Sequence, residues 1–138
     1  MRIVVDTNVL VSGLLTPHGP PGRIVDGILL GELVPIFDDR ILREYALVLA
    51  RPRFRFDPAR VAAVLDFLER AGEPVVAPPL AVELPDAGDR AFLEVAWHAD
   101  VNALVTGNLR HFPTEACSAV RVEAPGPFVQ RWASTRGR

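Results

Sequence analysis

The sequence predicts an α/β protein with three layers, in which helices cover both faces of a central, mostly parallel sheet. Strand-like and helix-like segments alternate along the chain, and this alternation is typical of parallel sheets. The first segment, residues 3–5, is a β-branched run that favours a buried strand. The 138 residues suit one domain and no linker divides them, so we expect a single domain over residues 1–138.

Local signals place the elements of the first part of the chain. A helix is expected directly after the first strand, at residues 7–15, and prolines and glycines indicate a loop at residues 16–22. A second, short helix follows at residues 23–31. Residues 33–37 are a candidate strand, and Pro35 favours an edge position for it because proline donates no ladder hydrogen bond.

The later elements follow from caps and breakers. A helix capped by Asp38 or Asp39 is expected to reach about residue 50, before Pro52. An aspartate cap and a proline in the first turn begin the next helix, at residues 58–72. The remaining expectations are an extended stretch at residues 74–79, a helix at 86–98, a strand at 102–106, a last strand at 118–122 and a last helix at 127–133.

Composition excludes several kinds of chemistry. All 15 basic residues are arginines, so P-loop nucleotide binding, Schiff-base catalysis and protein-kinase chemistry, which need lysine, are excluded. No apolar run approaches the ~20 residues that span a bilayer, so we expect no membrane segment. A single cysteine, Cys117, indicates a reducing compartment, and we expect a cytoplasmic protein.

Polar residues follow two of the expected strands. Asp6 ends the first strand and Asn108 follows the strand at 102–106, so both are expected at the carboxyl edge of the sheet, where ligands bind in this architecture. From these two residues alone a purely structural interpretation is favoured, with Asp6 capping the next helix and Asn108 forming a turn.

Carboxylates also lie on the apolar faces of two expected helices. Glu44 shares the stripe of Ile41 and Tyr45, and a buried glutamate needs a metal, a proton or an arginine partner. Asp89 shares its face with the apolar residues three, four and seven positions later, although Asp86 and Asp89 also suit a capping arrangement. Glu94 is expected to point into solvent.

Three carboxylates and one amide are therefore expected at one end of the sheet. Repulsion between them would raise their pKa values unless a cation lies between them. Oxygen ligands favour hard ions, so Mg²⁺ or Mn²⁺ is the expected cofactor, and such sites commonly serve phosphoryl chemistry.

Short motifs in a fixed order resemble those of a PIN domain, and most closely the PIN toxins of bacterial toxin–antitoxin systems. The motifs are DTNVLVS at 6–12, EY at 44–45, PDAGD at 85–89, VTGN at 105–108 and HF at 111–112. The resemblance implies a parallel α/β fold and a Mg²⁺- or Mn²⁺-dependent ribonuclease. It also implies an RNA substrate, a possible cognate antitoxin and a homodimer.

The resemblance assigns roles to individual residues. Asp6, Glu44 and Asp89 match the family's metal-binding acids, with Asp86 as a nearby companion. Asn108 falls where many members have aspartate, and this departure removes one negative charge from the metal site. The implied reaction is hydrolysis of a phosphodiester by a water molecule that the metal activates.

Further residues are expected to orient these ligands or to bind RNA. Thr106, and Thr7 or Asn8, would orient the ligands through hydrogen bonds. Arginines alternate with aromatic residues in the segment RPRFRF, which suits contact with phosphates and bases, although its phenylalanines equally suit core anchors. The candidate RNA contacts are Arg51, Arg53, Arg55, Arg110 and His111.

Other functions fit less of the sequence. A catalytically weak PIN-like module that binds RNA or a protein is the main alternative, and Asn108 keeps it open. A receiver domain also places an acid after its first strand but uses a lysine, which this chain lacks. A Rossmann dinucleotide site would need a glycine-rich turn where DTN stands.

Overall fold

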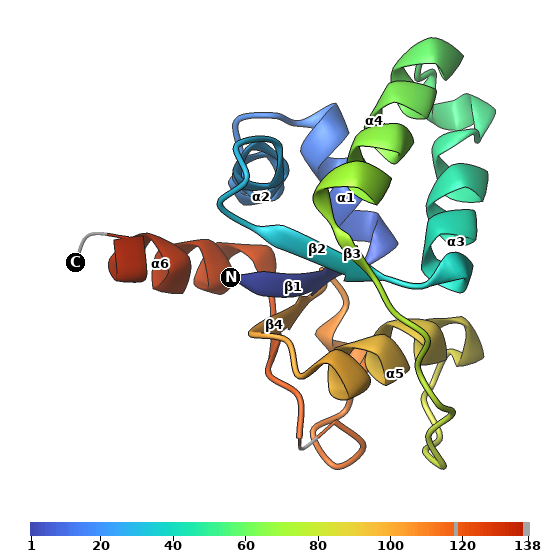
Figure 1. Cartoon of the computed structure of the whole chain (residues 1–138), viewed down its shortest axis with the longest axis vertical. Helices are drawn as coiled ribbons and strands as arrows, with labels where there is room; N and C mark the ends of the chain where they lie inside the picture. The colour runs from blue at the N-terminus through green and yellow to red at the C-terminus, as the bar shows by residue number, and fades with distance from the viewer. Residues whose placement is uncertain (118, 137–138) are drawn as a thin grey trace.

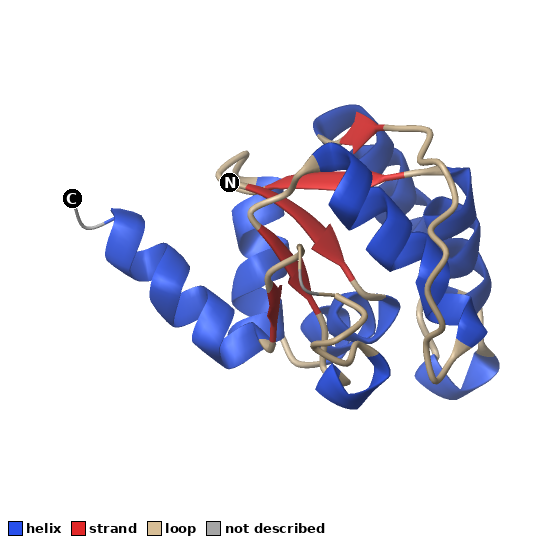
Figure 2. Ribbon diagram, turned by 90° about the horizontal axis from the view of Figure 1, so that it is seen from below, coloured by secondary structure: helices blue, strands red, loops and turns tan. Residues whose placement is uncertain are grey.

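Five parallel strands form the central sheet, in the order β3-β2-β1-β4-β5. The computed structural model describes residues 1–117 and 119–136. Figure 1 shows the sheet between its helices, and Figure 2 shows the strands from below. The strands are β1 (Arg2–Val5), β2 (Val34–Phe37), β3 (Glu73–Pro74), β4 (Ala103–Val105) and β5 (Val122–Glu123).

Helices lie on both sides of this sheet. In Figure 1, α1 to α4 lie on one side and α5 on the other, while α6 extends beyond the sheet at the end where the N-terminus lies. The α-helices are α1 (Thr7–Leu15), α2 (Pro20–Leu29), α3 (Asp39–Leu49), α4 (Pro58–Ala71), α5 (Arg90–Ala99) and α6 (Pro125–Arg136). Single 3₁₀ turns are η1 (Pro52–Phe54), η2 (Ala87–Asp89) and η3 (Leu109–His111). Across the described residues, no helix combines the length and hydropathy needed to cross a membrane.

The central strand β1 fixes the edge at which polar residues gather. Its neighbour β4 runs parallel to it with Ile3 opposite Ala103 and Val5 opposite Val105, so the two strands end together. Asp6 continues the pairing, since its backbone N–H donates to the carbonyl of Val105 at 2.9 Å. All three residues of β4 and the last three of β1 are buried, as expected for strands covered on both faces. The residues that follow them therefore emerge side by side.

The expected three-layer α/β/α fold is confirmed, and most elements lie where the sequence predicts them. Asp38 caps α3 by accepting from the N–H of Ile41 at 3.0 Å, and Asp57 caps α4 through Ala59. The second helix is an exception, since α2 begins at Pro20 and not at residue 23. Proline at the first helical position needs no N–H donor, so the residues that signalled a loop start the helix instead.

Three other predictions need correction. β2 is not an edge strand, because β3 pairs with it. The pairing begins at Ile36, one residue after Pro35. The N–H that Pro35 lacks therefore disrupts no pairing with β3. The last strand lies at Val122–Glu123, later than predicted, and Ser118 of the predicted strand falls outside the described residues. The last helix is longer than predicted at both ends.

Candidate active site

One cavity of about 500 Å³ opens where β1 and β4 end. It brings together residues that are far apart in the sequence, from α1, α3, η1, η2 and η3. The predicted site residues on its wall are Asp6, Thr7, Asn8, Glu44, Arg51, Arg53, Asp86, Asp89, Asn108 and His111. Thr106 is fully buried and contacts the site through Asp6. Arg55 and Arg110 are exposed and are not among the residues that form this wall.

Asp6 is held by hydrogen bonds from a residue after β4 and from a residue in the first turn of α1. Its carboxylate is buried and accepts from the Thr106 hydroxyl at 2.7 Å and from the Asn8 side-chain amide at 3.4 Å. The same threonine oxygen accepts from the backbone N–H of Asn108 at 3.0 Å. Although Asp6 stands at the N-cap position of α1, its side chain makes no capping hydrogen bond. Its carboxylate therefore faces the cavity, as a ligand would.

Glu44 reaches the same cavity from α3. It is half-buried, and the Thr7 hydroxyl donates a hydrogen bond to its carboxylate. Its neighbour Tyr45 is buried, and the Tyr45 hydroxyl donates to the backbone carbonyl of Val5. No arginine forms an ion pair with Glu44 within the described part of the chain, so the salt-bridge interpretation of this glutamate is not supported.

Asp86, Asp89 and His111 form the third side of the cavity. One ligand atom from each lies within 4.8 Å of the others. Asp86 is exposed and caps the η2 turn by accepting from the N–H of Gly88 at 2.9 Å, so the capping interpretation of Asp86 is confirmed. Asp89 is only 8% exposed. Its Oδ2 lies 2.9 Å from Nδ1 of His111 but accepts no well-aligned hydrogen bond.

Burial and neighbouring carboxylates raise the pKa values of three of these carboxyl groups. Burial is the largest cause in each case and raises the pKa of Asp6, of Glu44 and of Asp89, whose pKa reaches about 6. Repulsion from Asp86 adds to all three, and repulsion from Asp6 adds to Glu44 and Asp89. Hydrogen bonds from threonines and the nearby His111 only partly offset these effects.

These residues fit a divalent cation. Carboxylate oxygens are the donors that hard cations prefer, and a cation would relieve the repulsion between them. The buried Oδ2 of Asp89, which lacks a well-aligned hydrogen-bond donor, is a polar atom that such an ion would satisfy. The carboxylates on this wall therefore supply donors that suit Mg²⁺ or Mn²⁺, and among the described residues the ligand atoms of Asp86, Asp89 and His111 lie within 4.8 Å of one another.

The segment RPRFRF places only part of its side chains at the cavity. Arg51, Arg53 and Phe54 line the wall, and the Arg53 guanidinium stacks over the Phe54 ring at 4.7 Å from its centroid. Phe54 also stacks on Phe56 at 5.8 Å between centroids, and both phenylalanines are partly buried against the core. Arg55 has a left-handed backbone with φ of 55° at the end of η1. The segment thus both anchors to the core and contributes cations to the cavity.

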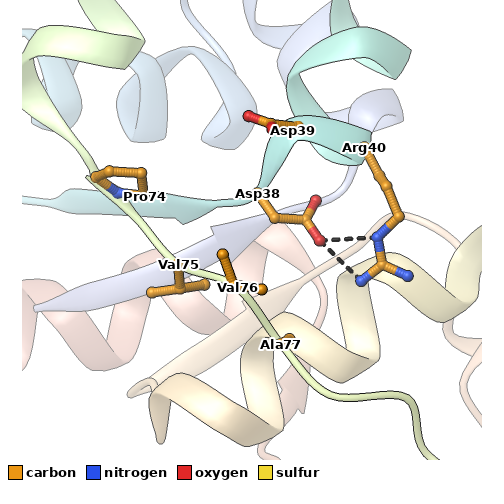
Figure 3. Close-up of a pocket in the computed structure, with 7 residues that line it drawn as sticks. All are labelled: Asp38, Asp39, Arg40, Pro74, Val75, Val76 and Ala77. Atoms are coloured by element: carbon orange, nitrogen blue, oxygen red, sulfur yellow. Dashed lines mark hydrogen bonds and ion pairs between the residues drawn. The ribbon is translucent and has the colours of Figure 1, made fainter.

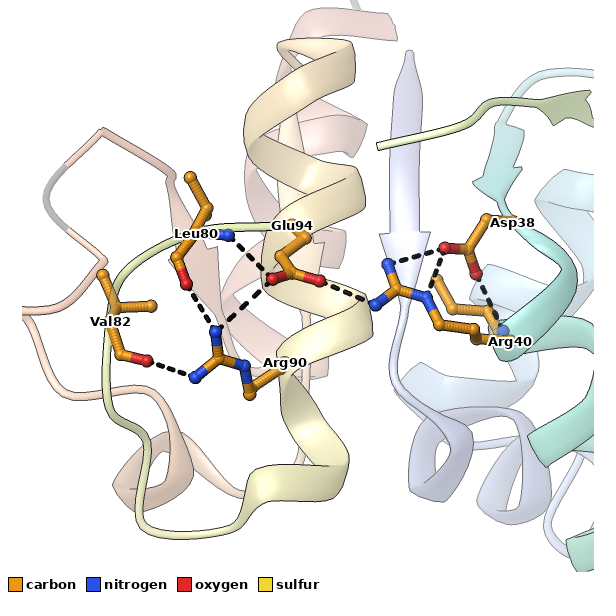
Figure 4. A network of polar contacts seen from close by, with 7 residues as sticks. Asp38, Arg40, Leu80, Val82, Arg90 and Glu94 are labelled. Carbon is orange, nitrogen blue, oxygen red and sulfur yellow. Dashed lines mark hydrogen bonds and ion pairs between the residues drawn. The ribbon is translucent and has the colours of Figure 1, made fainter. Parts of the chain in front are cut away.

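The prediction that Glu94 points into solvent is wrong. Glu94 is 3% exposed and accepts from Arg40 at 2.7 Å and from the N–H of Leu80 at 2.8 Å, as Figure 4 shows. Arg90 lies beside it and donates to the carbonyls of Leu80 and Val82. The irregular segment 75–86 packs over this face of α5. The hydrogen bonds of Glu94 and Arg90 to Leu80 and Val82 hold the segment against the helix.

A second cavity, of about 460 Å³, lies between the start of α3 and the segment after β3. Figure 3 shows its wall, formed by Asp38 to Arg40 and by Pro74 to Ala77. Arg40 neutralises Asp38 across a distance of 2.7 Å, and the opposite wall is apolar. This cavity therefore lacks the clustered free carboxylates of the first one, which remains the candidate active site.

Comparisons with known proteins agree with this architecture. The family model described as a PIN domain matches residues 2–110. An uncharacterized protein of Methanocaldococcus jannaschii is 36% identical over 55 residues, which are 40% of this chain and 36% of that protein. The chain thus matches only about a third of the length of this relative. The crystal structure of VapBC2 from Rickettsia felis, bound to a DNA fragment from their promoter, contains a chain with the same fold. Its TM-score is 0.58 at 14% identity, over 90% of this chain and 98% of that one.

The fold and the cavity define the class of protein: a parallel α/β protein with a carboxylate-lined site where its central strands end. The chain belongs to the PIN domain family, whose members are generally nucleases. The resemblance expected from the sequence motifs is confirmed.

The buried Glu94 generates a prediction about stability. Glu94→Gln is expected to lower the free energy of unfolding by about 1–3 kcal/mol at pH 7, because the change removes the charge that faces Arg40. Burial raises the pKa of Glu94, but its hydrogen bonds to Arg40 and Leu80 bring it below the ordinary value of 4.5. The stabilisation is therefore present above pH 4.5 and lost as pH falls through the lower folded pKa.

Urea denaturation at neutral and at acidic pH checks this prediction. The difference between wild type and Glu94→Gln should shrink in acid. The exposed Glu69 on α4 supplies the control, since Glu69→Gln should change stability by less than about 0.5 kcal/mol. Equal effects of the two substitutions at neutral pH would show that the Glu94 network contributes nothing.

Proposed function

We propose that the protein is a Mg²⁺- or Mn²⁺-dependent endoribonuclease, and that it is the toxin component of a toxin–antitoxin system. The observation that carries the proposal is the convergence of Asp6, Glu44 and Asp89 on one cavity, each with a raised pKa. The chain's membership of a nuclease family supports the same chemistry. Clustered carboxylates that form no ion pair with arginine among the described residues are suited to hold the cations that phosphodiester hydrolysis requires.

Each residue has a defined role in this proposal. Asp6, Glu44 and Asp89 hold the cation, with Asp86 close by and the Asn108 amide as an uncharged donor. When bound, the cation activates water and stabilises the charge that develops on the phosphate. Thr106 orients the Asp6 carboxylate through a buried hydrogen bond, so the ligand geometry is set before substrate binds.

Thr7 and Asn8 complete this arrangement. Thr7 donates to Glu44, and the Asn8 amide contacts Asp6 while its oxygen accepts from the N–H of Gly107 at 3.1 Å. Asn8 therefore connects the loop after β4 to the ligand at the end of β1. These contacts link the site residues that come from opposite ends of the chain.

Arginines at the cavity rim are proposed to bind the RNA backbone. Arg51 and Arg53 line the cavity, and stacking on Phe54 preorganises the Arg53 guanidinium for a phosphate. Arg55 and Arg110 would contact more distant phosphates, because they are exposed beyond the cavity wall. His111 would lie nearest the scissile phosphate.

The biological assignment extends the comparison with the VapBC2 chain, whose fold this protein shares. We propose that a cognate antitoxin binds this protein, that it acts in the cytoplasm as a homodimer, and that residues 1–138 are one domain. The neighbouring reading frame tests the assignment most directly, since an antitoxin-like gene beside this one would support it.

The alternative proposal is a catalytically weak PIN module that binds RNA or a protein without cleaving it. Asn108 favours it, because the exposed amide at this position adds no charge to the cation site. A metal-dependent cleavage assay separates the two proposals.

Asp6→Asn is expected to abolish metal-dependent RNA cleavage while the protein stays folded. The change removes a ligand charge from the centre of the site and keeps a side chain that Thr106 can still contact. Single-turnover cleavage should fall by more than about tenfold. Asp66→Asn, on the exposed face of α4, is the matched control and should cleave as wild type does. A rate above about a tenth of wild type in Asp6→Asn would remove Asp6 from the proposed ligand set.

Asn108→Asp is expected to tighten Mn²⁺ binding and to raise the cleavage rate at low Mn²⁺, with little change at saturation, because it supplies an anionic oxygen. Asn108→Ala should reduce activity less than Asp6→Asn does. Metal titrations of single-turnover cleavage measure both effects, with Gln130→Glu on α6 as a control for added charge. If Asn108→Asp leaves the metal dependence unchanged, Asn108 acts only as a turn residue.

A further inference from the structure

The site contains one nitrogen donor among its oxygen donors. His111 lies in the η3 turn, and its backbone N–H donates to the carbonyl of Asn108 at 3.0 Å. This turn folds the imidazole back toward the carboxylates that begin α5. As a result, Nδ1 of His111 lies 2.9 Å from Oδ2 of Asp89. The histidine therefore reaches the carboxylates of Asp86 and Asp89.

Asp89 has an oxygen that its surroundings leave unsatisfied. The residue is 8% exposed, and its Oδ2 accepts no well-aligned hydrogen bond despite the nearby imidazole. His111 is more open, with 37% of its side chain exposed, so an ion entering from solvent can reach both groups. An ion pair alone would be expected to align an N–H with this buried oxygen. A shared cation satisfies both groups without that alignment.

We propose that Asp86, Asp89 and His111 form a mixed carboxylate–imidazole set that binds a transition-metal dication, such as Mn²⁺ or Co²⁺, in preference to Mg²⁺. One ligand atom from each residue lies within 4.8 Å of the others. Mg²⁺ favours oxygen donors and keeps its waters, whereas an imidazole nitrogen increasingly favours later first-row metals. The inference rests on the metal site of the proposed function and adds its ion selectivity.

His111 also bears on the role of Asn108. The amide of Asn108 carries no charge, and the imidazole of His111 supplies a neutral donor three residues later. The set thus gains a nitrogen donor without gaining a negative charge. Selectivity, and not loss of the metal, is the expected consequence.

Metal titrations of the full chain, without RNA, test the inference. Co²⁺ binding is followed by its visible absorption, and Mg²⁺ and Mn²⁺ binding by calorimetry. His111→Gln should lower the ratio of Co²⁺ to Mg²⁺ affinity by about tenfold or more. The affinity for Mn²⁺ should fall less than the affinity for Co²⁺, because Mn²⁺ binds nitrogen donors most weakly among the first-row dications. The visible spectrum of bound Co²⁺ should also change.

Two further variants complete the design. His98→Gln, at the exposed far end of α5, controls for the loss of any histidine and should leave the ratio unchanged. His111→Asp makes the set all-oxygen and should shift the preference toward Mg²⁺. Melting of each metal-free variant shows whether it is folded.

The inference is overturned if the ratio changes no more in His111→Gln than in His98→Gln, or if the wild type binds neither ion saturably. Because the titration contains no RNA, failure to cleave RNA overturns the proposed function and leaves the selectivity inference standing. Unchanged selectivity overturns this inference alone.

Discussion

The burial of carboxyl groups close together, at the carboxyl ends of β1 and β4, is the constraint on which the site depends. Burial is the largest cause of the raised pKa values of Asp6, Glu44 and Asp89, and repulsion from Asp86 raises all three further. Asp89 has a pKa of about 6 in the folded protein against an ordinary 3.8. A raised carboxyl pKa means that the folded state loses stability as pH rises from 3.8 through about 6. At neutral pH the fold therefore holds charges that a bound cation would compensate.

The rest of the structure supports this unfavourable arrangement. Parallel register between β1 and β4 places Asp6 beside Thr106, and a buried hydrogen bond fixes the carboxylate there. On the other side of the sheet, Glu94 binds Arg40 and the segment 75–86, which leads to Asp86 and Asp89. The carboxylate of Glu94 is thus compensated by arginine, whereas those in the cavity lack such partners among the described residues. This contrast separates a structural acid from candidate ligands.

Most of the fold and the central acids could be predicted from the sequence, because local rules govern them. Asp6 follows a β-branched strand, which places it at the carboxyl edge of the sheet, and helical periodicity places Glu44 on the buried face of its helix. Glu94 could not be placed in this way, because an irregular segment covers it and no periodic signal predicts where such a segment packs. The contact of His111 with Asp89 depends on a 3₁₀ turn that periodicity does not encode. The direction of the Arg55 side chain likewise depends on the left-handed backbone of Arg55 itself, which no sequence pattern here signals.

The central claim is that these carboxylates form a cation site. The most direct test is the melting temperature of the full chain between about pH 4 and pH 7, with chelator and with millimolar Mn²⁺. The account predicts that Mn²⁺ raises the melting temperature and that the increase grows with pH, because deprotonation creates both the repulsion and the ligands. Equal melting temperatures with Mn²⁺ and with chelator at pH 7 would contradict it.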